Sequence, residues 1–261
     1  SEEKVKLPER MLSTDKAYSW EEVQKWLERI TKSAEEINFP LKDVQLKGTA
    51  KLDGFAGYDD GVKLYTRGDG KKGSDITRAF ERGLGVYNDG ERGQGAGEIV
   101  VKRSYFESHL SNHFEYPRNF QASLIKEKEL DHFALDAITN KAALFVPFSQ
   151  LPQWSGDITA FTDNFESIVN ELESGVDFDV DGVVFELVNE ELKIHMGSNR
   201  KFHRWQIAYK ENKEKAQVKV LSVTAQVGRT GKITPVAELE PTLLSGATIY
   251  RATGHHYGLV K

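Results

Sequence analysis

The chain has 261 residues, of which 39% are hydrophobic and 29% are charged, a balance typical of a globular protein with one large core or one core and a small second module. Cysteine is absent and the formal net charge is −5, which excludes disulfides, cysteine nucleophiles and thiolate metal sites and argues against a strongly basic DNA-binding domain. The sequence holds no apolar run long enough to cross a membrane and no signal-peptide pattern, so we expect a cytoplasmic protein with no membrane partner.

The first quarter of the chain predicts a helix and then a β-hairpin. Ser19 precedes Glu22 by three residues, which is the capping-box pattern, and the apolar residues of 23–30 recur on one helical face. Residues 44–70 then alternate apolar and polar side chains around an Asp-Gly pair at Asp60, a dipeptide typical of tight hairpin turns.

Further elements follow the hairpin. Runs rich in valine, isoleucine and aromatic residues predict strands over 97–106, 180–188 and 203–210, and residues 163–174 have the apolar spacing of a helix. From about Ala216 the chain has short β-type runs separated by glycine turns, which is typical of a small β-barrel. We therefore expect an α+β fold with several antiparallel strands and a β-rich C-terminal segment.

The segment "KLDG" places a lysine, Lys51, where an apolar strand is expected to turn. A lysine in a partly buried, cation-lined site loses its proton more easily than a solvated lysine and can then attack an electrophile. Asp53 could orient that amine or hold a hydroxyl group, and Gly54 permits close approach of another backbone. The four letters occur by chance in many chains, and taken alone they favour a solvated surface lysine.

The segments downstream decide between these readings. "TRGDGKKGSDIT", "GEIVV", "DVDGVVFEL" and "WQIAYK" follow in the order found in the covalent nucleotidyltransferases, which the chain resembles. "YPRNFQASL" and the long block "QVGRTGKITPVAELEPTLLSGATIYRATGHH" narrow the resemblance to the bacterial and phage-type NAD-dependent DNA ligases, from about Leu7 to His256. The resemblance implies an adenylation domain of antiparallel sheets flanked by helices over residues 1–211. It also implies the N-terminal part of an OB-fold, a partial β-barrel, over residues 212–261.

The reaction implied by this resemblance is the sealing of nicks in double-stranded DNA during replication and repair. A lysine takes AMP from NAD, AMP passes to the 5′-phosphate at the nick, and the neighbouring 3′-hydroxyl displaces AMP with Mg²⁺ present. The implied macromolecular partner is nicked double-stranded DNA, bound through its phosphates and independently of sequence.

The resemblance also implies roles for particular residues. Those matching the catalytic positions are Lys51, which receives AMP, Asp53, Asp181 and Lys210. Those matching nucleotide-binding positions are Leu12, Ser13, Arg67 and Glu98. Those expected to contact DNA phosphates are Arg118, Arg204 and Arg229. The implied Mg²⁺ ligands are Asp181 and Glu98.

Three positions depart from the family pattern. Thr49 stands where the family has a glutamate that contacts the adenine amino group, and Leu135 in "HFAL" is taken as the counterpart of an aromatic that stacks on adenine. Glu186 stands where the family has a lysine near the phosphate, so we expect weaker phosphate binding unless Lys193 or Lys201 compensates.

Two questions stay open from the sequence. The family's nicotinamide-binding domain and its zinc-finger, helix-hairpin-helix and BRCT regions have no counterpart in these residues, which is compatible with a shortened form or with a second ligase subunit that supplies them. The departures are also compatible with a degenerate, non-catalytic subunit that binds DNA or a partner chain. A ligase that uses another nucleotide donor is a further alternative.

Overall fold

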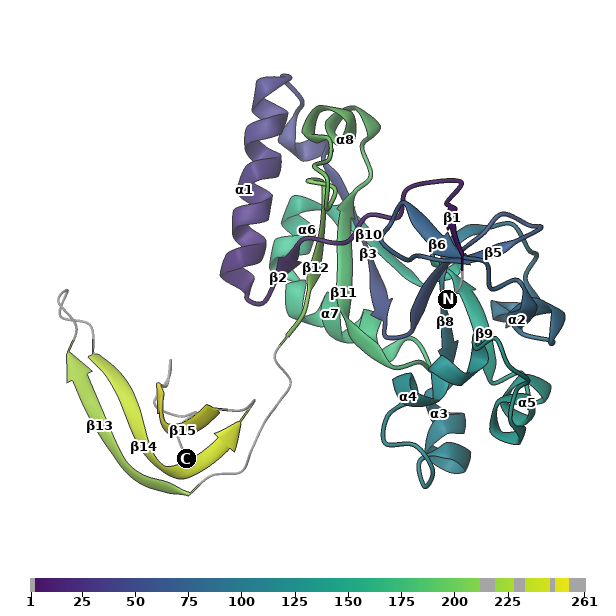
Figure 1. Cartoon of the computed structure of the whole chain (residues 1–261). Helices are drawn as coiled ribbons and strands as arrows, with labels where there is room; N and C mark the ends of the chain where they lie inside the picture. The colour runs from purple at the N-terminus through teal and green to yellow at the C-terminus, as the bar shows by residue number, and fades with distance from the viewer. Residues whose placement is uncertain (1–2, 212–218, 228–232, 245–246, 254–261) are drawn as a thin grey trace. The chain divides into compact units, whose positions relative to one another are not determined.

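The computed structural model describes residues 3–211, 219–227, 233–244 and 247–253 (Figure 1). The chain divides into two compact units, Ser1–Glu211 and Asn212–Lys261, which are described separately below. Among the described residues, no helix combines the length and the apolar character that a membrane crossing requires.

A five-stranded sheet forms one half of the first unit (Figure 1). Its neighbouring strands pair antiparallel except at one edge, where the short β2 joins β12 in parallel. In spatial order the strands are β10 (Gln153–Asp157), β3 (Gln45–Leu52), β11 (Val180–Leu187), β12 (Gln206–Tyr209) and β2 (Lys16–Ala17).

A second five-stranded sheet follows directly after β3, because the chain turns at Asp53 and Gly54 into β4. Its strands in spatial order are β5 (Leu64–Thr66), β4 (Phe55–Asp59), β8 (Gly95–Val101), β9 (Ala143–Pro147) and β7 (Gly85–Val86), with only the β7–β9 pair parallel. A small two-stranded sheet pairs β1 (Lys4–Lys6) with β6 (Lys72–Ser74).

Helices cover the two sheets in two groups. Those whose apolar side chains pack with the first sheet are α1 (Trp20–Glu36), α6 (Ile158–Asp163), α7 (Phe165–Ser174) and α8 (Glu190–Met196). Those nearer the second sheet are α2 (Arg78–Glu81), α3 (Arg103–Tyr105), α4 (Pro117–Gln121) and α5 (His132–Thr139). Short helical turns complete the unit at η1 (Leu41–Asp43), η2 (Tyr87–Asp89), η3 (Phe106–Leu110), η4 (Ala122–Leu124) and η5 (Phe148–Gln150).

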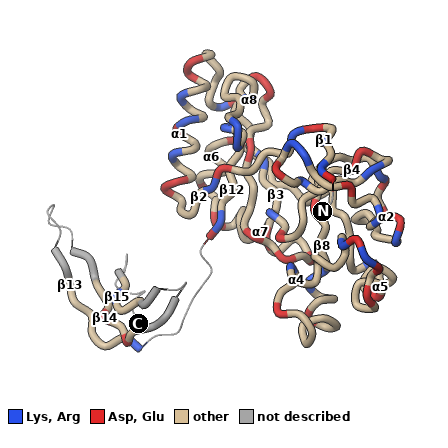
Figure 2. Tube along the Cα trace, in the orientation of Figure 1, with Lys and Arg blue, Asp and Glu red and all other residues tan. Residues whose placement is uncertain are grey.

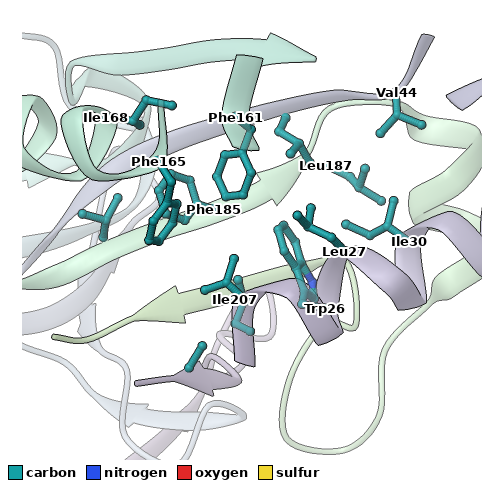
Figure 3. Close-up of a cluster of buried hydrophobic side chains, with 14 of the residues drawn as sticks. Trp26, Leu27, Ile30, Val44, Phe161, Phe165, Ile168, Phe185, Leu187 and Ile207 are labelled. Carbon is teal, nitrogen blue, oxygen red and sulfur yellow. The ribbon is translucent and has the colours of Figure 1, made fainter. Parts of the chain in front are cut away.

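The largest hydrophobic core lies between the first sheet and its helices. Trp26 and Ile30 of α1 and Phe161 of α6 are fully buried and belong to one cluster with Phe185 of β11 (Figure 3). The expected cap is present, since the Glu22 amide donates to the Ser19 hydroxyl over 3.2 Å and the Tyr18 amide donates to the Glu22 carboxylate over 2.9 Å. This cap fixes where α1 begins and so sets which of its faces meets the sheet.

The burial of β3 shows which face of the sheet is free for function. Its even-numbered residues from Leu46 to Leu52 are buried and its odd-numbered residues from Gln45 to Lys51 are only half-buried. Successive side chains of a strand point to opposite faces, so Lys47, Thr49 and Lys51 share the face away from the helical core.

Most elements expected from the sequence are confirmed. The hairpin at Asp60 pairs β4 with β5, and α7 and β11 lie within the expected ranges. The strand expected over 97–106 is wrong at its end, because β8 stops at Val101 and Arg103 begins a helix. The Arg103 amide donates to the Asp177 carbonyl, which draws the chain away from the ladder.

The described part of the second unit is a three-stranded antiparallel sheet. Its strands are β13 (Val220–Val227), β14 (Ile233–Leu244) and β15 (Ala247–Thr253), in that spatial order. The whole chain is therefore of mixed α+β class, with a β-rich C-terminal segment, as expected. In the first unit, basic and acidic residues are interspersed along α1 (Figure 2), as on a solvated helix face.

Candidate active site

Two adjoining cavities open on the odd-numbered face of β3. The first, here the Glu186 cavity, has a volume of about 310 Å³ and is lined by residues of both sheets and of the segment 11–14. The second, here the Asp181 cavity, has a volume of about 350 Å³ and extends past the turn at Asp53 to Arg118. Lys51, Arg67 and Glu98 are among the residues that line both.

Lys51 lies where the two cavities meet. Its Nζ is 3.8 Å from Asp181 Oδ2, and the Nζ of Lys210 is 2.8 Å from the same oxygen. Burial and then the positive charge of Lys210 lower the pKa of Lys51, while Asp181 and Glu98 act in the opposite direction. A larger share of this amine is therefore neutral at neutral pH than for an exposed lysine.

The carboxylate of Asp181 reaches the two lysines from a bulge in β11. The pairing of β11 with β3 shifts register between Val180 and Val183. Gly182 has a φ of +96°, and a Cβ added there would lie 2.1 Å from the Tyr209 carbonyl oxygen. Only glycine fits this position, so the "DG" pair belongs to the backbone geometry that presents Asp181.

The "KLDG" turn is fixed by a different glycine contact. A Cβ on Gly54 would lie 2.2 Å from the Ile99 carbonyl oxygen of β8, so close backbone approach explains the glycine. Arg118 donates from Nη1 to Asp53 Oδ1 and to the Gly54 carbonyl, both over 3.1 Å. The fully buried Gln121 donates to the Asp53 carbonyl over 3.0 Å. Helix α4 therefore holds the turn that follows Lys51.

Glu98 is the most deeply buried carboxyl group of the site, with a residue exposure of 8%. Burial raises the pKa of Glu98 to about 7, although the Gly54 amide, which donates to Oε1 over 3.2 Å, and the charge of Lys51 favour the ionised form. Near neutral pH this group exists in both protonation states, which is a common property of functional carboxyl groups.

Two family models match the chain. The adenylation domain of the NAD-dependent DNA ligases matches residues 2–132, and the OB-fold domain of the same ligases matches residues 217–261. The chain belongs to the NAD-dependent DNA ligase family.

Relatives named DNA ligase extend this result over the whole chain. Identity is 68% over 261 residues to the Ruthia magnifica protein, covering 100% of this chain and 42% of that relative. It is 58% over 257 residues to the Psychromonas ingrahamii protein, covering 98% of this chain and 40% of that relative. A more distant match, Desulfatibacillum aliphaticivorans DNA ligase, is 42% identical over 257 residues, with 98% and 40% covered. The chain thus spans about two fifths of the length of the curated relatives it matches.

The structure brings together most of the positions that match this ligase family. Leu12, Ser13, Arg67 and Glu98 line the Glu186 cavity with Lys51, and Arg67 donates from Nε to the Met11 carbonyl over 3.0 Å. The Asp181 cavity adds Asp53, Asp181 and Arg118.

The two remaining arginines lie elsewhere. Arg204 is exposed, lines neither cavity and donates to the Met196 carbonyl over 3.3 Å. Arg229 lies outside the described residues.

The assignment of Leu135 as the adenine-facing position is wrong. Leu135 is an exposed residue of α5, and none of the described residues that line the two cavities comes from that helix. Phe148, directly after β9, lines the Glu186 cavity. The sequence signal that could have found it is the apolar run 142–148, which predicts a buried strand that ends beside this aromatic residue.

The structure gives Glu186 a lysine partner away from Lys51. The cross-strand partners of Glu186 are Lys47 on β3 and Gln206 on β12. Lys47 lies four residues along β3 from Lys51. Lys47 Nζ lies 3.8 Å from Glu186 Oε1, so Lys47 is its ion-pair partner. The positive charge of Lys193 also favours the ionised form of Glu186, whereas Lys201 lines a different cavity.

The site offers a limited set of metal ligands. Within the described ranges, no group of three or more histidine, aspartate or glutamate residues is placed to hold a metal ion. Asp181 and Glu98 do line the same cavity. Two carboxylates together with substrate phosphates are an ordinary Mg²⁺ environment, so this pair fits that ion and does not suit an all-protein metal centre.

Proposed function

We propose that this chain carries the adenylation domain of an NAD-dependent DNA ligase over residues 1–211 and the N-terminal part of its OB-fold over residues 212–261. Lys51 is the residue that receives AMP. The observation that supports this most strongly is its environment: a half-buried amine with a lowered pKa, held beside a carboxylate that a second lysine shares.

The first step uses Lys51 as a nucleophile. Its neutral amine attacks the α-phosphorus of NAD, a phosphorus–nitrogen bond forms, and the bond to the oxygen of nicotinamide mononucleotide breaks. Lys210 lies beside Lys51 and is positioned to offset charge on the phosphoryl group, and Arg67 lies on the same cavity wall. Asp181 keeps the two lysines together before the nucleotide arrives.

The later steps act on nicked double-stranded DNA in the cytoplasm, where a bacterial ligase serves replication and repair. AMP passes from Lys51 to the 5′-phosphate, and the 3′-hydroxyl then displaces it. Arg118, beside the Asp53 turn, and the more distant Arg204 and Arg229 are the proposed contacts to DNA phosphates, which position the duplex without reading its sequence. Asp181 and Glu98 are the proposed carboxylates for Mg²⁺, which when bound would spread negative charge at the phosphates.

The relatives carry the matched region within one longer polypeptide, of which it forms about two fifths. The comparisons therefore give no support to a separate second ligase subunit. The nicotinamide-binding part that the family uses can be supplied from one of these relatives when the proposal is tested.

The test is an intact-mass measurement after incubation with Mg²⁺ and either NAD or ATP, alone and with the nicotinamide-binding domain of a relative. We expect an AMP adduct from NAD that is lost in Lys51→Ala and retained in Lys25→Ala, a control on the exposed face of α1. An adduct from ATP alone would overturn the choice of donor. No adduct in any mixture would overturn the catalytic proposal and favour the non-catalytic binding subunit.

A further inference from the structure

The face of the first sheet that carries Lys51 is organised in successive rows of side chains. At one end Lys47, Glu186 and Gln206 lie side by side on β3, β11 and β12. The next row contains Thr49 and Val184, and Lys51 then lies opposite the bulge that holds Asp181. Four residues of strand separate the end rows, about 13 Å at roughly 3.3 Å per residue. This is comparable with the extent of a nucleoside monophosphate from its base edge to its phosphate.

The two ends of the Glu186 cavity differ in chemistry. Lys51 and Glu186 line the cavity from opposite ends of the stretch of sheet just described, and Leu12, Phe148 and Val184 add apolar or aromatic walls. Glu186 is the one charged group among the described lining residues of its own row. Its side chain is 21% exposed, so it faces the cavity without being freely solvated.

The charge of Lys47 favours the ionised form of the Glu186 carboxylate. Lys47 does not line the cavity, yet its Nζ lies 3.8 Å from Glu186 Oε1. Burial raises the pKa of Glu186, and the charges of Lys47 and Lys193 act in the opposite direction by favouring the carboxylate. A carboxylate has more acceptor positions than one lysine fills, so Glu186 can still accept a hydrogen bond from a ligand in the cavity.

We propose that Glu186 recognises the base of the bound nucleotide by accepting a hydrogen bond from the exocyclic 6-amino group of adenine. The inference rests on the proposed function for the placement of the phosphate at Lys51. Adenine offers a donor at this position, whereas a 6-oxopurine has a carbonyl acceptor there, which a carboxylate repels, and carries its donor on N1. Glu186 is therefore a specificity-determining residue. From β11 it supplies the charged acceptor for the adenine amino group that Thr49 on β3 does not have.

The test compares AMP with IMP, in which a carbonyl replaces the 6-amino group and the neighbouring N1 carries a hydrogen. Isothermal titration of the full chain with AMP and with IMP measures binding without chemistry, because neither carries the leaving group that adenylylation requires. We expect AMP to bind roughly 10- to 100-fold more tightly than IMP, the range for a hydrogen bond to a charged group. In Glu186→Gln the ratio should fall below about threefold, because the amide can offer either an acceptor or a donor.

Glu191→Gln is the matched control, since Glu191 is an exposed glutamate of α8 and lines neither cavity. Circular dichroism confirms that each variant is folded. Equal binding of AMP and IMP by the unchanged chain, an unchanged ratio in Glu186→Gln, or no binding of either nucleotide would each overturn the inference. An AMP adduct on Lys51 together with equal AMP and IMP binding would leave the proposed function standing and remove only this assignment.

Discussion

Two lysine–carboxylate pairs join the same two strands, β3 and β11, and both have a nitrogen–oxygen separation of 3.8 Å. They are Lys51 with Asp181 and Lys47 with Glu186. Their surroundings differ, because Lys210 approaches the same Asp181 oxygen to 2.8 Å and thereby repels the charge on Lys51. Sharing one carboxylate between two amines favours a neutral Lys51, whereas the Lys47–Glu186 pair keeps a half-buried carboxylate available as an acceptor.

The backbone around the two pairs differs as well. At the Lys47 end β3, β11 and β12 pair in regular register, and at the Lys51 end β11 is bulged at Asp181 and Gly182. The bulge turns a carboxylate towards Lys51, the proposed nucleophile, and the pairing beside Lys47 has no such shift. The following predictions test this contrast.

The largest expected effect is on the bulge itself. Gly182→Ala should lower the free energy of unfolding by about 3 kcal/mol or more, because the added Cβ meets the Tyr209 carbonyl at 2.1 Å in a positive-φ conformation. Gly61→Ala is the matched control, since Gly61 has the same φ of +96° but its nearest contact to an added Cβ is 3.4 Å. Urea denaturation measures both. Equal losses in the two variants would show that strain alone matters and that the Tyr209 contact does not.

A second effect concerns stability as a function of pH. Burial raises the pKa of Glu98 to about 7, from 4.5, so the folded state keeps a proton that the unfolded state releases. Stability from this group is complete below about pH 4.5 and is lost as pH rises through about 7, by up to about 3 kcal/mol. The difference in unfolding free energy between the unchanged chain and Glu98→Gln, followed by denaturation from pH 4 to 8, isolates this contribution. A difference that stays constant over that range would contradict it.

A third effect separates the shared pair from the single one. Lys210→Met should slow adduct formation by about 10²-fold at neutral pH, because it removes a cation from the phosphoryl group. Without Lys210 the pKa of Lys51 rises, so the residual rate should also require a higher pH than in the unchanged chain. Lys210→Arg keeps the charge and serves as the control. Single-turnover mass measurements at several pH values give both quantities, and an unshifted pH profile would show that Lys210 does not influence Lys51.

The smallest expected effect concerns Phe148, the aromatic residue that lines the Glu186 cavity. Phe148→Ala should weaken AMP binding by roughly tenfold, the lower part of the range for loss of an aromatic beneath a base. Leu135→Ala, on the exposed side of α5, should leave the affinity unchanged. Titration with AMP compares the two variants. A larger loss in Leu135→Ala than in Phe148→Ala would restore the position first inferred from the sequence.

Features encoded by local sequence patterns were predictable. The Ser19 cap, the turn at Asp60 and the strand that carries Asp181 each depend on neighbouring residues, and all are confirmed. Lys51 was singled out because several segments occur in a fixed order, which one short motif could not have shown.

Features that depend on tertiary contact were not predictable. The assignment of Leu135 rests on four matched letters, which do not show that its segment forms a helix, and Phe148, which follows a strand, carries no such match. The partner of Glu186 is Lys47, which adjoins it only through the pairing of β11 with β3. The raised pKa of Glu98 likewise arises from burial, which depends on how the two sheets come together.

Mapping the AMP adduct to a single lysine by peptide mass spectrometry tests the central claim most directly. The chain and its Lys47→Ala and Lys51→Ala variants are treated with NAD, Mg²⁺ and the nicotinamide-binding domain of a relative. The account predicts AMP on the peptide that contains Lys51 in the unchanged chain and in Lys47→Ala, and no adduct in Lys51→Ala. AMP on Lys47 or Lys210, or an adduct that persists in Lys51→Ala, would contradict it.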